Sequence, residues 1–289
     1  MVTIATTKLN SGNTIPVLGL GFWETPSNHA AEIAYAGLKA GYRLLDSAEA
    51  YGNEEGVAKG IAQWIAEDPK KHLREDVFYT TKIRDGFHGY DATKKALQGS
   101  LDKAKPIGYI DLVLVHSPQS DYEKRHGTWK ALQEAVAEGT VKNIGVSNYG
   151  IKHLKELFAY PDLKIKPVIN QLELHPWLTR TELVKFTKSE GIIVEAYSPL
   201  TRAKKFDDPD LVKLGKKYGK SPAQILIRWS LDKGFIPLPK TAHKERLASN
   251  LDVFDFKLEP EEVELLSGKN EDLKFCWDPT VYPLDNEKK

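Results

Sequence analysis

The fold is decided by the stretch Gly41-Tyr42-Arg43-Leu44-Leu45-Asp46-Ser47-Ala48-Glu49-Ala50-Tyr51-Gly52-Asn53-Glu54. It predicts a short buried strand that ends at Asp46, a loop that contains Tyr51, and a helix that begins at Glu54. A carboxylate and a phenol therefore follow the same strand. Because an isolated phenol has a pKa of about 10, Tyr51 needs a nearby cation to act as an acid near neutral pH.

The same order of strand and helix recurs along the chain. Apolar runs predict strands over residues 17–21, 43–46, 77–82, 110–116, 143–147, 168–172, 192–197 and 236–239. Helical patterns follow them and begin at Asn28, Glu54, Asp91, Gly127, Ile151, Thr179, Asp207 and Lys244, with one additional helix over 221–233. Strands that are apolar throughout are typical of parallel sheets buried on both faces.

Eight such units predict a (β/α)8 barrel, which typically needs about 250 residues. A doubly wound open sheet would alternate in the same way. A dinucleotide-binding sheet of that kind carries G-x-G-x-x-G after its first strand, and Gly19-Leu20-Gly21-Phe22-Trp23 does not match that motif. No linker-like or low-complexity stretch interrupts the pattern, so we expect a single domain over residues 1–289.

Both ends of the chain depart from the repeating pattern. Residues 3–17 contain Asn10-Ser11-Gly12-Asn13 between two extended stretches and predict an N-terminal β-hairpin that caps the barrel. Residues 270–289 are aromatic and aperiodic, which predicts a C-terminal tail over the active-site end.

Composition narrows the classes of partner. The net charge is +1 with acids and bases interspersed, which argues against a nucleic-acid or membrane surface and favours a small-molecule partner. Cys276 is the single cysteine, no signal-peptide pattern begins the sequence, and no apolar run approaches the roughly 18 residues of a membrane span. We expect a cytoplasmic protein that is a monomer, with a dimer as the alternative.

Polar residues gather where three successive strands end. Active sites of (β/α)8 barrels lie at the carboxyl ends of the strands, where Asp46, Lys82 and His116 are found with Tyr51 beside them. A buried ion pair between Asp46 and Lys82 would stabilise the fold little, which favours a functional role for the two residues. Lys82 would lower the pKa of Tyr51 and make it a general acid. His116 would orient a carbonyl oxygen and stabilise negative charge that develops on it.

Each of these residues also has a structural explanation. An aspartate at a strand end can cap a turn, a buried histidine can be a satisfied core residue, and a loop tyrosine can serve packing. Their convergence at one end favours a shared site, because unrelated structural roles would scatter over both ends. Together the four groups suit carbonyl reduction or its reverse.

Reduction requires a hydride donor, and side chains cannot supply one, so a nicotinamide cofactor is implied. Ser147, Asn148 and Gln171 suit the hydrogen bonds of a carboxamide, and Tyr197 offers a ring for stacking.

The end of the eighth strand suits a phosphate group. Lys240 and Arg246 place two cations near a hydroxyl and a helix start, although a solvated basic turn would have the same composition. Two such cations favour a cofactor with a 2′-phosphate, and hence NADPH over NADH.

These motifs together resemble the aldo-keto reductase family over nearly the whole chain. The stretch from Gly41 to Glu54 resembles the first family signature, residues 142–149 the second, and residues 238–241 with Arg246 and Asn250 the third. The resemblance implies a (β/α)8 barrel that catalyses NAD(P)H-dependent carbonyl reduction.

The resemblance also implies roles for individual residues. Asp46, Tyr51, Lys82 and His116 correspond to the family's catalytic set. The implied contacts to NADPH or NADP+ are Ser147, Asn148, Gln171, Tyr197, Ser198, Leu200, Lys240, Thr241, Arg246 and Asn250. Trp23, His116 and Trp277 would line the substrate pocket, and no metal is expected.

The sequence departs from the family pattern at several positions. Phe22 stands where threonine is frequent, Ser117 follows His116 where tryptophan is common, and Ala58 replaces a signature glycine. We expect these departures to reshape the substrate pocket. The stretch 201–206 is short for a loop that covers the cofactor, so cofactor exchange should be less obstructed. The helical tryptophans are expected in the core: Trp64, Trp129 and Trp229.

The predicted function is NADPH-dependent reduction of aldehydes or ketones, with ketoesters among the candidate substrates and Tyr51 as the general acid. One alternative is a non-catalytic relative that binds cofactor in a regulatory or structural role. Another is an NAD-dependent alcohol dehydrogenase. An unrelated phosphate-binding barrel would leave Tyr51 unexplained.

Overall fold

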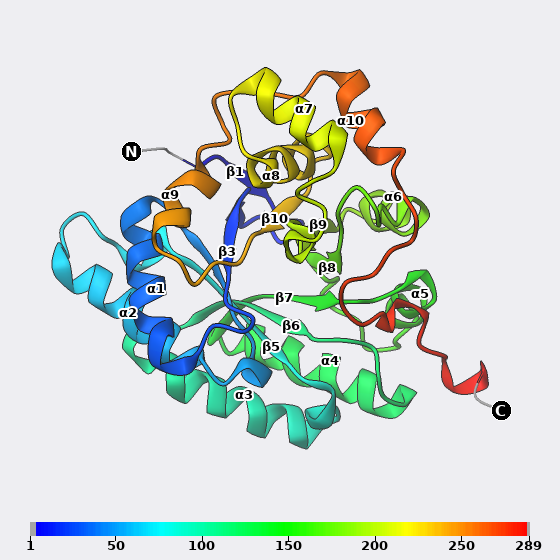
Figure 1. The fold of residues 1–289 in the computed structure, drawn as a ribbon. Helices are drawn as coiled ribbons and strands as arrows, with labels where there is room; N and C mark the ends of the chain where they lie inside the picture. The colour runs from blue at the N-terminus through cyan, green and yellow to red at the C-terminus, as the bar shows by residue number, and fades with distance from the viewer. Residues whose placement is uncertain (1–3, 288–289) are drawn as a thin grey trace.

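The structure is a computed structural model, and it describes residues 4–287. Eight parallel strands follow one another around a barrel in the order of the chain (Figure 1). They are β3 (Gly19–Gly21), β4 (Leu44–Asp46), β5 (Phe78–Ile83), β6 (Ile110–Val115), β7 (Val141–Ser147), β8 (Ile169–Glu173), β9 (Ile193–Tyr197) and β10 (Ile236–Leu238). The first and last strands meet through a bridge between Gly21 and Lys240, where the Gly21 N–H donates to the Pro239 carbonyl at 3.0 Å. The predicted (β/α)8 barrel is confirmed.

Helices surround the strands on the outside (Figure 1). They are α1 (Ser27–Ala40), α2 (Glu54–Glu67), α3 (Tyr90–Ala104), α4 (Tyr122–Ala137), α5 (Ile151–Phe158), α6 (Thr181–Ser189), α7 (Pro209–Tyr218), α8 (Pro222–Asp232), α9 (Glu245–Leu251) and α10 (Pro260–Ser267). The predicted start of α4 at Gly127 is wrong, because Asp121 caps the helix by accepting the Lys124 N–H at 2.9 Å. The predicted core tryptophans are buried on these helices: Trp64, Trp129 and Trp229.

The predicted hairpin consists of β1 (Thr6–Lys8) and β2 (Thr14–Pro16) and closes the amino end of the barrel. Leu9 and Ile15 join the apolar cluster that fills the barrel interior. Ser11 fixes the turn by donating to Asn143 Oδ1, near the start of β7, at 2.7 Å. Thr3, where the predicted hairpin begins, lies outside the described residues. The hairpin therefore covers the end of the barrel away from the carboxyl ends of the strands.

The barrel interior is narrow where β3 runs between its neighbours. A Cβ at Gly19 would lie 2.6 Å from side-chain atoms of both Leu44 and Leu238. Glycine at this position therefore lets the two leucines fill the interior below the polar rim.

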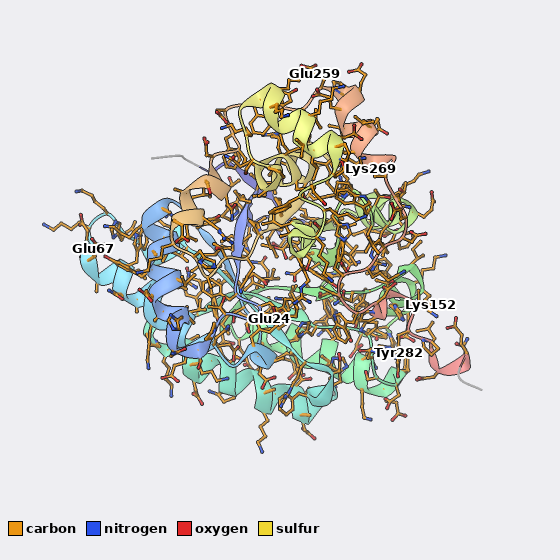
Figure 2. All side chains as sticks on the ribbon, viewed as in Figure 1. Glu24, Glu67, Lys152, Glu259, Lys269 and Tyr282 are labelled. Carbon is orange, nitrogen blue, oxygen red and sulfur yellow. The ribbon has the colours of Figure 1, made fainter. Side chains whose placement is uncertain are left out.

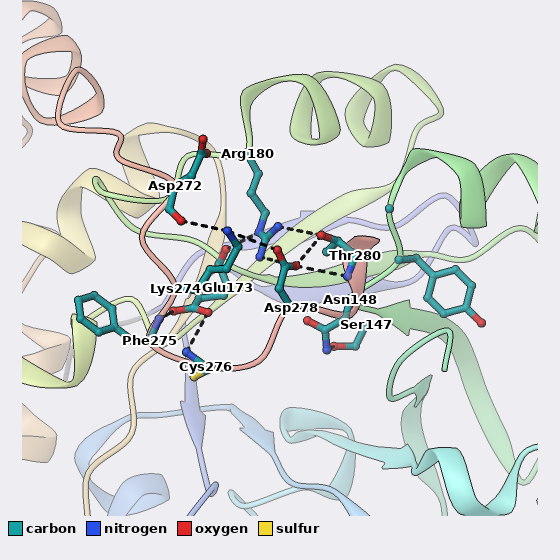
Figure 3. Close-up of polar contacts among 12 residues, drawn as sticks. Ser147, Asn148, Glu173, Arg180, Asp272, Lys274, Phe275, Cys276, Asp278 and Thr280 are labelled. Atoms are coloured by element: carbon teal, nitrogen blue, oxygen red, sulfur yellow. Dashed lines mark hydrogen bonds and ion pairs between the residues drawn. The ribbon is translucent and has the colours of Figure 1, made fainter. Parts of the chain in front are cut away.

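The C-terminal tail crosses the active-site end and is anchored by two charged residues of the barrel (Figure 3). Glu173, at the end of β8, accepts the N–H groups of Phe275 at 2.7 Å and Cys276 at 3.2 Å. Arg180 donates to Asp278 Oδ1 at 3.0 Å. These anchors hold the segment between them at the barrel mouth, as the predicted tail requires.

No helix within residues 4–287 combines the length and the apolar character that a membrane crossing requires.

Candidate active site

A cavity of about 870 Å³ opens at the carboxyl ends of the strands. Most of the predicted site residues line it: Trp23, Asp46, Tyr51, His116, Ser147, Asn148, Gln171, Tyr197, Ser198, Leu200, Lys240 and Trp277. Four others are not among its lining residues: Lys82, Thr241, Arg246 and Asn250. The predicted residues thus converge on one space, with Lys82 behind its wall.

Lys82 and Asp46 form the predicted ion pair at the base of the cavity. The Lys82 ammonium is completely buried and donates to Asp46 Oδ1 at 2.6 Å and to the Ser47 carbonyl at 2.8 Å. Burial alone would lower the pKa of Lys82, but the charge and the hydrogen bond of Asp46 lead the effects that outweigh it and raise that pKa. Lys82 therefore stays charged over the physiological pH range.

Tyr51 ends the short helix η1 (Glu49–Tyr51) and packs against Lys82, whose Nζ lies 5.2 Å from the centroid of the phenol ring. The sequence predicts that Lys82 lowers the pKa of Tyr51, and Lys82 does act in that direction, but burial of the phenol outweighs it. Desolvation raises the pKa of Tyr51, and Lys82 offsets the rise only in part because Asp46 partly neutralises it. Tyr51 thus holds its proton at neutral pH, and Lys82 reduces the free energy needed to release it.

His116 follows β6 and faces the phenol. Its ring centroid lies 5.8 Å from that of Tyr51 and 6.1 Å from that of Trp277, both in edge-on geometry. Desolvation, with the positive charge of Lys82, lowers the pKa of His116 to about 3. The imidazole is therefore neutral and can donate a single N–H to a ligand.

The amide and hydroxyl side chains predicted to bind a carboxamide form one network. Asn148 donates to the His116 carbonyl at 3.0 Å and accepts from the Tyr197 hydroxyl at 2.8 Å. Ser147 donates to the Gln171 carbonyl at 2.9 Å. The Gln171 side chain donates to Asp46 Oδ2 at 2.9 Å, while its amide oxygen has no hydrogen-bond partner among residues 4–287. That oxygen leaves an acceptor for a ligand N–H.

The predicted phosphate-binding residues lie after β10. Lys240 reaches the cavity, and neither its ammonium nor the exposed guanidinium of Arg246 has an acidic partner within the described part of the chain. Lys244 between them is paired with Glu32. Thr241 is buried and uses its hydroxyl to accept the His243 N–H at 3.0 Å. Lys240 at the cavity and Arg246 on the exposed surface six residues later are thus two cations unpaired among the described residues, and such cations suit phosphate groups.

Part of the cavity wall is aromatic and partly open. Trp23 is 37% exposed and Trp277 is 44% exposed, and both line the cavity as predicted. The Arg202 guanidinium lies 4.8 Å from the Trp23 ring centroid and 3.2 Å from both oxygens of Glu24, which is labelled in Figure 2. Arg202 and Glu24 were missed because their pairing joins two loops that are distant in the sequence.

Only one of the family departures bears on the cavity. Phe22 and Ala58 are buried in the core and do not line it, so the expectation that they reshape the pocket is wrong. Ser117 is also buried, but it donates to Asp85 Oδ1 at 2.6 Å, and Asp85 lines the cavity. A carboxylate thus joins the wall beside His116. The serine after His116 was the signal in the sequence, and its partner Asp85 was missed.

Within residues 4–287, no group of three or more His, Cys, Asp or Glu side chains could hold a metal ion.

The fold and the cavity define this chain as a (β/α)8 barrel protein with an ionisable site at the carboxyl ends of its strands. The model of the Aldo/keto reductase family matches residues 17–271, so the chain belongs to the aldo-keto reductase family of oxidoreductases.

Similar proteins come from fungi, bacteria and animals. An uncharacterized oxidoreductase of Saccharomyces cerevisiae is 46% identical over 276 residues, which are 96% of this chain and 98% of the relative. Glyoxal reductase of Bacillus subtilis is 38% identical and covers 92% of this chain and 93% of its own length. The crystal structure of a Bombyx mori aldo-keto reductase in complex with NADP has a TM-score of 0.89 and 37% identity, and the match covers 98% of this chain and 99% of that one.

Proposed function

We propose that this chain is an NADPH-dependent carbonyl reductase that converts aldehydes or ketones to alcohols. The observation that carries the proposal is the position of Tyr51, between the buried Lys82 ammonium and the neutral His116 imidazole, in a cavity large enough for a cofactor and a small substrate. A buried ion pair is a poor source of stability, which favours a catalytic role for the Lys82–Asp46 pair.

NADPH supplies the hydride when it is bound. On this proposal Lys240 and Arg246 hold its phosphate groups, including the 2′-phosphate, and the Tyr197 ring packs against the nicotinamide. The free Gln171 amide oxygen, with Ser147 and Asn148, meets the carboxamide. The Bombyx mori relative was crystallised in complex with NADP, which supports NADPH as the cofactor. We further propose that four other residues implied by the family resemblance contact the cofactor: Ser198, Leu200, Thr241 and Asn250.

The chain's own contribution to the chemistry is control of one proton. Tyr51 keeps its proton at neutral pH and donates it to the carbonyl oxygen, while Lys82 stabilises the phenolate that remains. The neutral His116 donates its N–H to the same oxygen, which fixes the carbonyl and stabilises charge that develops on it. Asp46 holds Lys82 in position for this role.

The substrate end suits small carbonyl compounds. Trp23 and Trp277 form its apolar wall, and Asp85 adds an acceptor for a hydroxyl group. Glyoxal reductase is among the relatives, so small dicarbonyls are natural first substrates to test, together with other aldehydes and ketoesters.

The test compares the wild-type protein with Tyr51→Phe on a panel of aldehydes and ketoesters. Loss of a general acid typically costs about 10²- to 10⁴-fold in rate, so NADPH consumption should fall by that factor while NADPH binding, followed by fluorescence, is unchanged. Unchanged turnover in Tyr51→Phe would contradict the role of Tyr51. Absence of turnover in the wild-type protein across the panel would favour the non-catalytic alternative.

Four finer features belong to the same proposal. A lower KM for NADPH than for NADH would separate it from an NAD-dependent alcohol dehydrogenase. The single domain predicts one cooperative unfolding transition, cell fractionation tests the cytoplasmic location, and analytical ultracentrifugation tests the monomeric state.

A further inference from the structure

Glu195 is a buried acid in the barrel interior that the proposed chemistry does not use. It lies on β9 between Ile193 and Tyr197, and side chains two residues apart on a strand share a face. Ile193 packs on the apolar cluster inside the barrel, and Tyr197 lines the cavity, so Glu195 lies just below the polar rim. It has no exposed surface.

Glu195 is connected to the catalytic ion pair through one nitrogen. The Gln171 Nε2 donates to Glu195 Oε2 at 2.8 Å and to Asp46 Oδ2 at 2.9 Å. The other oxygen of Asp46 accepts from Lys82 at 2.6 Å. Glu195, Gln171, Asp46 and Lys82 therefore form one continuous hydrogen-bonded chain that ends beside Tyr51.

The charges around Glu195 do not balance if both acids are ionised. The charged groups that face it are Asp46 on β4 and Lys82 on β5, while the neighbouring strands contribute Gln171 and Ile236. One ammonium would then serve two carboxylates, and Lys82 is already bonded to Asp46. Glu195 Oε1 has no hydrogen-bond partner within the described residues, which disfavours an ionised carboxylate at this place.

Glu195 is therefore the acid that keeps its proton. Burial, with the negative charge of Asp46, raises the pKa of Glu195 to about 8. Around neutral pH the pair then carries a single negative charge, which matches the single positive charge of Lys82.

We propose that Glu195 is a positioning residue of this active site: as a neutral acid it holds Gln171 against Asp46, and when it ionises it adds a second negative charge beside the Lys82–Asp46 pair. The inference rests on the proposed function, because it assigns a consequence to the proton of Tyr51. Added negative charge disfavours the phenolate, so ionised Glu195 raises the pKa of Tyr51.

The test measures the pKa of the Tyr51 phenol directly, by NMR of ring-labelled tyrosine in the cofactor-free protein. Tyr51→Phe identifies the resonance. Glu195 loses its proton before Tyr51 does, so Glu195→Gln, which keeps the shape and removes the ionisation, should lower the pKa of Tyr51. We expect a shift of about half to one pKa unit, the size of an interaction with one unit charge several ångströms away at intermediate dielectric.

Thr80→Val is the matched control. Thr80 faces the same interior two residues before Lys82, and its buried hydroxyl has no hydrogen-bond partner among residues 4–287. This variant should leave the pKa of Tyr51 unchanged. Should Glu195→Gln fail to fold, Glu195→Met offers an apolar side chain of similar length and the same expected direction.

A second readout follows alcohol oxidation with NADP+ as a function of pH. In Glu195→Gln the rise of the rate should move to lower pH by the same amount, about three- to tenfold in rate at a fixed pH on the rising limb. A Tyr51 pKa equal in Glu195→Gln and wild type would overturn the inference and leave Glu195 a structural residue. Absence of turnover in the wild-type protein would instead contradict the proposed function, and the NMR titration would still decide the role of Glu195.

Discussion

Replacement of Lys82 by methionine is the perturbation with the largest expected consequences. The substitution removes the ammonium and keeps a side chain of similar length in a position with no exposed surface. It leaves the Asp46 carboxylate, whose side chain is 6% exposed, without its cation. Two quantities should change together: the free energy of unfolding and the pKa of Tyr51.

The effect on stability follows from the buried carboxylate. Removing one partner of a buried ion pair typically costs about 3–5 kcal/mol, because the other charge is left uncompensated. The double variant Asp46→Asn/Lys82→Met should regain most of this loss, since neither charge then remains. Urea unfolding of the two single variants, the double variant and the wild-type protein gives the coupling energy directly.

The effect on Tyr51 can be worked from the distance of 5.2 Å between Lys82 Nζ and the phenol ring centroid. At an effective dielectric constant of about 20, a unit charge at that distance contributes about 3 kcal/mol, or about two pKa units. Asp46 keeps raising the pKa of Tyr51 in this variant and does not offset the loss of Lys82, so the Tyr51 pKa should rise by about two units. Steady-state reduction of an aldehyde should slow by about 10- to 100-fold or more.

The refuting results are specific. Wild-type kcat in Lys82→Met would show that the ammonium does not assist Tyr51. An equal loss of stability in Lys82→Met and in the double variant would show that the two charges are not coupled.

Three further predictions follow from other parts of the site. Arg246→Ala should raise KM for NADPH by about tenfold or more and leave KM for NADH nearly unchanged, because a charge-assisted hydrogen bond is worth about 1.5–3 kcal/mol. Lys244→Ala is the control and should change neither KM, because the Lys244 ammonium is paired with Glu32. Equal effects of Arg246→Ala on both cofactors would contradict the 2′-phosphate assignment. Glu173→Gln should loosen the tail, because it weakens the hydrogen bonds that the Phe275 and Cys276 N–H groups donate to residue 173. Substrate KM should rise and proteolysis after residue 270 should become faster, while the affinity for NADPH is unchanged. A tail that resists proteolysis as well as in the wild type would refute this prediction. Folding raises the pKa of Glu195 from 4.5 to about 8, so its contribution to stability is complete below about pH 4.5 and is lost as the pH rises to about 8. The difference in Tm between Glu195→Gln and wild type should therefore grow between these two pH values. A Tm difference that stays constant with pH would contradict this prediction.

Much of the fold could be predicted because the strands are apolar and end in polar residues. Once eight such strands alternate with helices, a barrel places Asp46, Lys82 and His116 on one rim, since all parallel strands end on the same side. The tryptophans on helices were recognised as core by the same periodicity.

The remaining features depend on quantities that the linear sequence does not contain. The rise in the pKa of Tyr51 comes from burial of its hydroxyl, which depends on how loops pack above it. The anchoring of Cys276 by Glu173 joins positions about a hundred residues apart. Glu195 was hidden inside an apolar run, where it counts as one polar residue in a strand until Gln171 is seen beside it.

The most direct test of the account is a single turnover in a stopped-flow instrument. Wild-type protein with NADPH already bound is mixed with excess aldehyde, and the loss of NADPH absorbance is followed against the same experiment on Tyr51→Phe. We expect rapid consumption of bound NADPH by the wild type and consumption at least about 100-fold slower by Tyr51→Phe at equal NADPH occupancy. Equal rates in the two proteins would contradict the assignment of Tyr51 as the proton donor.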